Sequence, residues 1–197
     1  MQRNPFNPFD WYWLSDDGRL FSSAAQALVA ESHPAYVAWT AENRPTPWPR
    51  DQTGSQTIAA LQDVLTPYGL FADLSLYTTI KRDELIDAGF TFGGVVYQSR
   101  PTDRENIIGA ALMASMAVAG GAQPGNYRWA DPDADFEWIA LDNTKVKMDA
   151  PTVIAFGRAQ AARKQALIFA ARTIKDQVAA GAITTTAAID AALAATP

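Results

Sequence analysis

The sequence contains no cysteine, and its only histidine is His33. A chain without cysteine cannot form disulfides, thiolate metal sites or a cysteine nucleophile. A single imidazole also leaves no Cys/His set for zinc or a redox metal. A Ser-His-Asp triad would have to use His33, but this residue precedes Pro34 at an expected helix start, which favours a capping or surface position. We therefore expect no metal, no cofactor and no enzymatic activity.

The sequence also lacks an excess of basic residues and a long hydrophobic run. Its formal net charge is -5, and the basic residues between Arg158 and Lys175 are spread along an expected helix. Because nucleic-acid binding needs clustered cations to replace phosphate counterions, we expect no nucleic-acid partner. The longest apolar run, 107–121, is shorter than the ~20 residues that span a bilayer, so we expect no membrane insertion. The first six residues include no apolar core of a signal peptide, which favours synthesis in the cytoplasm.

Hydrophobic residues make up 48% of the chain and include six tryptophans, so there is ample material for a packed core. In the first third, Asp17-Gly18 separates two aromatic runs and predicts a β-hairpin. Ser32 is a candidate cap for a helix with Pro34 in its first turn. A further helix is expected over 56–65, because apolar residues recur there at helical spacing. Pro67-Tyr68-Gly69 ends this helix, and we place a domain boundary after residue 69.

The segment 44–50 is too rich in proline for a helix or a central strand. It could be an extended arm that lies on a partner, because a polyproline-like segment loses little entropy on docking. It could also be an ordered surface loop held down by Trp48.

The remaining residues, 70–197, predict a larger helical domain with two hairpins. A helix over 74–87 leads to a hairpin about Gly93-Gly94, and Thr102 and Glu105 form the pattern of a capping box. The helix that follows, 107–120, is apolar nearly all round, so we expect it to lie in a domain core or inside a homo-oligomeric bundle.

A second hairpin is expected over 136–148, and Asp149 should cap a long helix that ends at Gly181. Leu167, Ile174 and Val178 form a seam along this helix for another helix. A last short helix should start at Thr184 or Thr185. The predicted fold class is therefore α+β, mainly helical with short antiparallel hairpins.

Acidic residues supply the remaining candidates for chemistry. Asp131, Asp133 and Asp135 open like a calcium loop, but Phe136 and Asp142 occupy the places of its glycine and its bidentate glutamate. An acidic surface turn is the favoured interpretation.

The aromatic residues could offer a flat surface for stacking sugars, although core or interface packing is the commoner fate of such clusters. These residues are Trp11, Tyr12, Trp13, Trp39 and Trp48.

Two parts of the chain resemble known sequences. From about residue 71 to 195 it resembles a domain of unknown function, DUF4376, that is common in tail proteins of tailed bacteriophages. The residues that carry this likeness are Ile86-Asp87-Ala88-Gly89-Phe90, Gly94, Tyr97-Gln98, Arg104, Ile107, Trp138, Asp142-Asn143 and Met148-Asp149-Ala150. The N-terminal part is similar to small modules encoded beside phage tail-fibre genes. That likeness is carried by Trp11-Tyr12-Trp13, Phe21-Ser22-Ser23, Tyr36-Val37-Ala38-Trp39 and Pro45-Thr46-Pro47.

The resemblance implies a structural protein of a phage tail, made in the host cytoplasm and located in the virion, where it would contact other tail proteins and form a homo-oligomer. A tail-fibre assembly chaperone and a module that binds sugars of the host surface are the alternatives. The candidate interface residues are Trp11, Trp13, Trp39, Pro45, Pro47, Trp48, Leu167, Ile174 and Val178, and the helices 107–120 and 152–180 are candidate oligomerisation surfaces.

Overall fold

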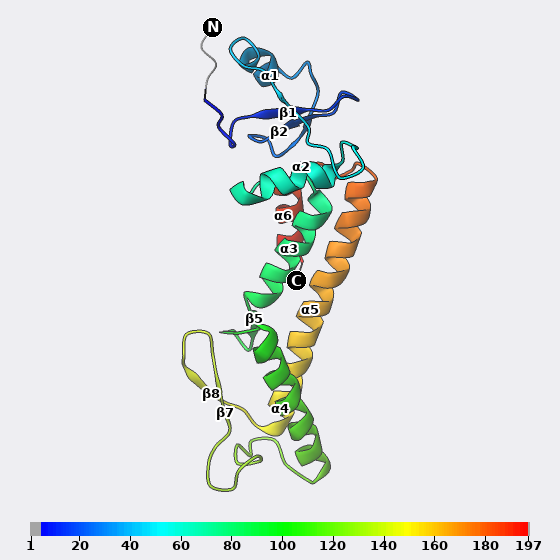
Figure 1. Ribbon diagram of the computed structural model, residues 1–197. Coiled ribbons are helices and arrows are strands. Elements are labelled where there is room, and N and C mark those ends of the chain that lie inside the picture. The colour runs from blue at the N-terminus through cyan, green and yellow to red at the C-terminus, as the bar shows by residue number, and fades with distance from the viewer. Residues whose placement is uncertain (1–4, 197) are drawn as a thin grey trace. The chain divides into compact units, whose positions relative to one another are not determined.

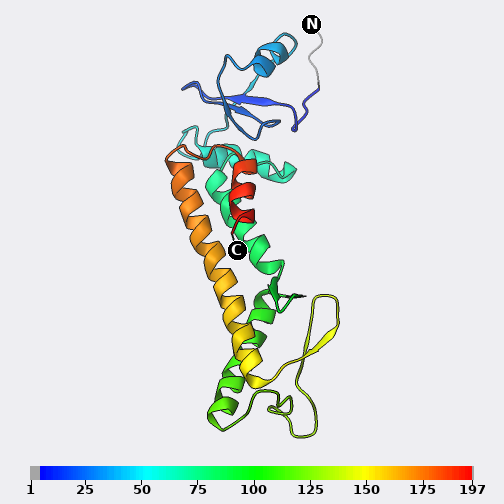
Figure 2. The same cartoon turned by 180° about the vertical axis from the view of Figure 1, so that it is seen from behind.

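The computed structural model describes residues 5–196. It confirms a mainly helical α+β fold with short antiparallel hairpins (Figures 1 and 2). Contacts within the chain divide it into two compact units. Unit 1 contains residues 5–79 and 172–194, and unit 2 contains residues 80–171 and 195–196. The division by contacts therefore differs from the predicted one at residue 69, because the C-terminal residues 172–194 pack with the N-terminal part.

Unit 1 is built on a four-stranded sheet in the order β3-β2-β1-β4. The strands are β1 (Tyr12–Leu14), β2 (Leu20–Ser22), β3 (Ala27–Val29) and β4 (Thr46–Pro47). The hairpin of β1 and β2 was predicted, and Gly18 in its turn has φ +85°, a conformation that glycine adopts without strain. Strand β3 was not predicted, because Ala25-Gln26 before it carries no proline or glycine turn signal.

The proline-rich segment is ordered on the sheet of its own chain. Strand β4 pairs with β1 in parallel, and the backbone N–H of Trp48 donates to the carbonyl of Leu14 at 3.1 Å. The indole Nε1 of Trp48 donates to the carbonyl of Trp13 at 2.9 Å. Of the two predicted possibilities, the ordered segment held down by Trp48 is the one observed.

The other regular elements of unit 1 are helical. They are α1 (Pro34–Trp39), α2 (Ile58–Leu65), the 3-10 helix η1 (Thr66–Tyr68), α6 (Thr186–Ala194), the beginning of α3 (Leu74–Asp87) and the end of α5 (Ala150–Ala179). The prediction of Ser32 as the cap of α1 was wrong, since His33 occupies the N-cap position and Pro34 begins the helix. In the α6 region, the hydroxyl of Tyr77 donates to the carboxylate of Asp190 at 2.8 Å. The largest core cluster of unit 1 consists of Trp13, Phe21, Trp48, Leu61, Leu65 and Leu70.

Unit 2 packs two hairpins and α4 (Pro101–Ala119) around part of α5 (Ala150–Ala179). The hairpins are β5 (Phe90–Phe92) with β6 (Val95–Tyr97), and β7 (Glu137–Ile139) with β8 (Lys145–Lys147), and both were predicted. The buried ring of Phe156 is the centre of the core. Four rings lie 4.8–5.6 Å from it: Phe90, Phe92, Tyr97 and Trp138.

The structure confirms the predicted cap of α5 but not that of α4. The carboxylate of Asp149 accepts the backbone N–H of Thr152 at 2.8 Å, so the predicted cap of α5 is confirmed. The capping box of α4 was predicted two residues too late. Pro101 is already helical, and the N–H of Arg100 donates to the Asp103 carboxylate at 2.9 Å. Proline is favoured in the first turn of a helix, which fixes this earlier start. Among residues 5–196, no helix combines the length and the apolar character that crossing a membrane requires.

Candidate functional site: an aromatic cavity and an apolar helix face

Two of the predicted interface tryptophans lie in the interior of unit 1. Trp13 and Trp48 are each 2% exposed, so they have no surface to offer to a partner. The cation of Arg19 covers the ring of Trp48, with its guanidinium carbon 4.4 Å from the ring centroid. The prediction that these two side chains form an interface is therefore corrected: they pack the core. Pro45 is half-buried and Pro47 is exposed beside them.

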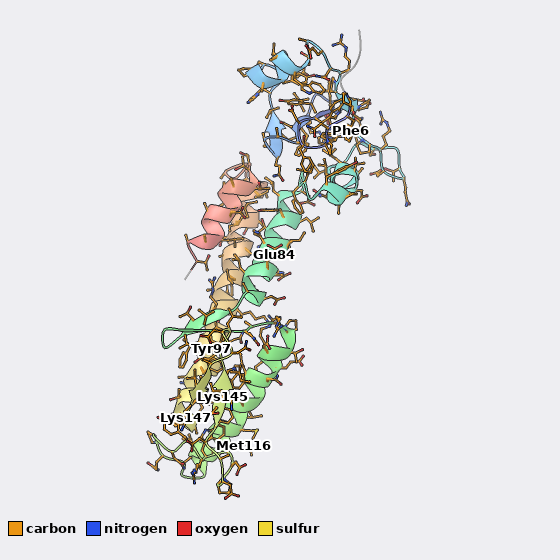
Figure 3. All side chains as sticks on the ribbon, turned by 90° about the vertical axis from the view of Figure 1, so that its left-hand side faces the viewer. Phe6, Glu84, Tyr97, Met116, Lys145 and Lys147 are labelled. Atoms are coloured by element: carbon orange, nitrogen blue, oxygen red, sulfur yellow. The ribbon has the colours of Figure 1, made fainter. Side chains whose placement is uncertain are left out.

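Trp11 and Trp39 remain partly exposed and lie together. Their ring centroids are 5.0 Å apart and the rings meet edge to face, with an angle of 88° between their planes. Tyr12 packs against the same face of the unit, 4.9 Å from Trp39. The indole Nε1 of Trp11 donates to the Thr46 hydroxyl at 2.8 Å, which fixes the orientation of the Trp11 ring. Phe6, labelled in Figure 3, stands edge-on at 5.1 Å from Trp11.

Trp11, Tyr12 and Trp39 line an open cavity of about 750 Å³ in unit 1. The volume falls within the ~300–1,000 Å³ of typical ligand pockets. Its polar lining residues are Asn7, Asp10, Glu42 and Asn43, and all four carry side-chain oxygen acceptors.

Asn43 differs from the other polar residues of the cavity because it is buried, with 7% of its surface exposed. Its Nδ2 donates to the carbonyl of Trp39 at 3.0 Å, which fixes the orientation of the amide. Its Oδ1 is then the one buried side-chain polar atom of residues 5–196 that has no hydrogen-bond partner. Buried acceptors are nearly always paired, so this atom requires an explanation. Sequence reasoning missed Asn43, because an asparagine at the end of a short helix has the ordinary signature of a turn.

In unit 2, helix α4 buries only one of its sides. Ile107 and Ala114 are fully buried, whereas Ile108, Leu112 and Met116 are 63%, 63% and 69% exposed. The latter three recur every four residues and therefore share one face (Met116 is labelled in Figure 3). Of the two predicted positions, full enclosure in the core of its own chain is not observed, and an apolar face of α4 remains outside that core. We call Ile108, Leu112, Met113 and Met116 the α4 face.

The predicted seam of α5 is mostly used within the chain. Leu167 and Ile174 are 0% and 3% exposed, so the prediction that they lie at an interface with another molecule is corrected. Val178 is half-buried and lines a different cavity of unit 1.

Helices α4 and α5 approach very closely within unit 2. A Cβ placed on Gly157 of α5 would lie 2.8 Å from the Cβ of Ala111 on α4, closer than carbon atoms tolerate. Gly157 therefore allows the helices to touch, and this contact leaves the α4 face on the outside.

The acidic residues of the calcium-loop-like segment 131–135 form hydrogen bonds within the chain. Asp135 accepts from Lys147 at 2.8 Å and from Arg128 at 3.3 Å, and these bonds hold the pKa of the Asp135 carboxyl below its ordinary value. The Asp131 carboxylate accepts the backbone N–H of Asp133 at 2.9 Å. In the part of the chain that the structure describes, no three acidic or histidine side chains come together as metal ligands.

The fold and these features define a mainly helical α+β protein with two prominent surfaces, one an aromatic cavity and one an apolar helix face. The sequence matches the family described as "Domain of unknown function (DUF4376)" over residues 72–193, and the chain therefore belongs to this family. This confirms the DUF4376 resemblance of the C-terminal part. No curated protein and no solved structure shows a significant match to the chain.

Proposed function

We propose that this protein is a structural component of a bacteriophage tail and that it acts through protein–protein interfaces, one of which joins copies of the chain. The observation that carries the proposal is the α4 face, a set of large apolar side chains that a single chain leaves in water. Contiguous apolar surface of this kind marks interaction sites on soluble proteins.

The expected gain from covering this face is considerable. Complete burial of a leucine, isoleucine or methionine side chain stabilises by about 1.5–3 kcal/mol. Four such side chains could therefore supply several kcal/mol, against an association cost of ~4–15 kcal/mol that further contacts would have to offset. Residues 108–118 contain no charged side chain, so nothing on this stretch of α4 opposes desolvation.

A second copy of the chain is the occupant that fits this face best. In a two-fold interface the same patch must complement itself, and an antiparallel pair of α4 helices centred near Leu112 would place Ile108 against Met116 of the other copy. An uncharged patch of flexible methionine and aliphatic side chains is self-complementary in this arrangement.

The assignment to a phage tail is supported by the family. Residues 72–193 match DUF4376, whose resemblance implies a phage tail protein, and the N-terminal part of the chain is similar to modules encoded beside tail-fibre genes. A subunit of the virion tail made in the host cytoplasm would use its remaining surface for other tail proteins. An assembly chaperone that leaves the particle is the second candidate, because an apolar face that is open before assembly suits a transient partner equally well.

The self-association is tested by measuring the molar mass of the purified chain by sedimentation equilibrium. We expect an oligomer for the natural sequence and a monomer for Leu112→Glu, because a carboxylate at the centre of the α4 face would be buried without a partner. Leu76→Glu is the matched control: Leu76 is a leucine of α3 that is 40% exposed and belongs to unit 1. A natural chain that remains monomeric at high concentration would refute this interface.

The tail location is tested by mass spectrometry of purified virions of a phage that encodes the chain. A structural subunit should be present at constant stoichiometry to the other tail proteins. Presence in the infected-cell lysate with absence from virions would instead identify the assembly chaperone.

A further inference from the structure

We propose that the aromatic cavity of unit 1 is a binding site for a neutral saccharide. The cavity of about 750 Å³ combines partly exposed tryptophan rings with oxygen acceptors, one of which is buried and unpaired. The inference does not depend on the proposed self-association, which concerns α4 in unit 2.

Two tryptophan rings form part of the cavity wall. Trp11 and Trp39 each keep part of their surface exposed, and both are held in place by neighbours. The Thr46 hydroxyl fixes Trp11, and Tyr12 packs against Trp39. The face of an aromatic ring carries partial negative charge, so it attracts the weakly positive C–H groups on one side of a pyranose.

The polar groups of the cavity call for a ligand rich in hydrogen-bond donors. Asp10 and Glu42 line it with carboxylates, which accept hydrogen bonds and cannot donate them when ionised. Asn43 adds a buried acceptor, Oδ1. The Nδ2 of the same amide already donates to the Trp39 carbonyl. Sugar hydroxyls supply several donors from one small molecule. A hydroxyl that reached Oδ1, after a shift of the atoms that now cover it, would relieve its unpaired state.

The arrangement of the rings favours a saccharide over an organic cation. A cation is held where several ring faces surround an empty centre. Here the edge of one tryptophan lies on the other at 5.0 Å, and Tyr12 closes on Trp39 at 4.9 Å, so these rings fill the centre themselves. They present an outer wall, which suits stacking of a flat ring.

The test begins with a glycan array of bacterial surface oligosaccharides probed with the full chain. The oligosaccharide with the strongest signal is then titrated into labelled protein, and the indole N–H resonances of the six tryptophans are followed by NMR. We expect shifts of the Trp11 and Trp39 signals, with the Trp129 signal in unit 2 unchanged. Tetramethylammonium chloride is titrated in parallel to test whether an organic cation binds in the cavity instead of a sugar.

Two variants and one control decide which groups bind. Trp11→Ala should weaken binding by about 3- to 10-fold through loss of the stacking wall. Asn43→Ala should weaken it by about 3- to 10-fold through loss of one hydrogen bond. Asn126→Ala, at an exposed asparagine of unit 2, should leave the affinity unchanged, and circular dichroism checks that each variant is folded.

Four results would overturn the proposal: no signal on the array, unshifted Trp11 and Trp39 indole resonances in the titration, shifts with the cation alone, or unchanged affinity in folded Trp11→Ala and Asn43→Ala proteins. None of these results bears on the mass of the oligomer, so the two proposals fail separately.

Discussion

Replacement of Gly157 by alanine tests the closest contact between α4 and α5. The new Cβ would lie 2.8 Å from the Ala111 Cβ, and the next neighbours, on Ile107, are 3.9 Å away. The steric cost of one extra methyl group in a packed site is about 1–3 kcal/mol. Alanine also favours a helix over glycine by ~1 kcal/mol, which acts in the opposite direction. The net expectation is a loss of about 0–2 kcal/mol.

A matched substitution separates the two effects. Gly109 is also helical, on α4, but an added Cβ meets nothing within 4 Å. Gly109→Ala should therefore stabilise by up to ~1 kcal/mol. The difference in free energy of unfolding between the two variants then measures the steric term alone, about 1–3 kcal/mol in favour of Gly109→Ala.

The assay is urea unfolding followed by circular dichroism, at one protein concentration for all variants. Ala111→Gly combined with Gly157→Ala should recover stability relative to the sum of the two single changes, because it returns the missing space. If Gly157→Ala stabilises as much as Gly109→Ala, the two helices do not approach in this way.

Two further changes test the core of unit 1 and the cap of α5. Trp48→Ala should destabilise by about 3–5 kcal/mol in urea unfolding, since it empties a buried site and leaves the Trp13 carbonyl without its indole donor, and a loss below ~1 kcal/mol would contradict that placement. For Asp149, partial burial works to raise the pKa, but hydrogen bonds from Gly125 and Thr152 hold it below its ordinary value. Its contribution to stability should therefore be complete above the unfolded-state pKa of about 3.9 and be lost as the pH falls through the lower folded-state pKa. Asp149→Asn, which keeps a capping oxygen, should lose less stability than the natural chain between pH 5 and 2, and parallel acid titrations of the two proteins would refute this.

Local signals predicted most of the elements. Turn glycines, a capping aspartate and the spacing of apolar residues identified three hairpins and the six α-helices of residues 5–196, because these signals act over a few residues. Strand β3 escaped prediction, since its turn places Gln26 at φ +47° without glycine or proline. The start of α4 was missed by two residues, because Pro101 was not recognised as a first-turn proline.

The side of each element that faces the core was harder to predict than the element itself. The sequence cannot distinguish Trp48, which is buried, from Trp39, which is partly exposed, since both are tryptophans near prolines or alanines. Likewise, an all-apolar helix such as α4 gives no periodicity from which to select the buried side. Burial depends on which distant segments pack there, and that information is spread over the whole chain.

The prolines in and beside strand β4 have a further consequence, for the solubility of the protein. Alternate backbone groups of a strand point in opposite directions, and the N–H of Trp48 points to β1. Residues 45, 47 and 49 therefore direct their backbone nitrogens away from the sheet, and all three are prolines, which have no hydrogen to donate. A foreign strand that approached this edge would find no ladder of donors. These three alternating prolines thus protect this edge of the sheet against edge-to-edge pairing with another sheet, which is a route to fibrils.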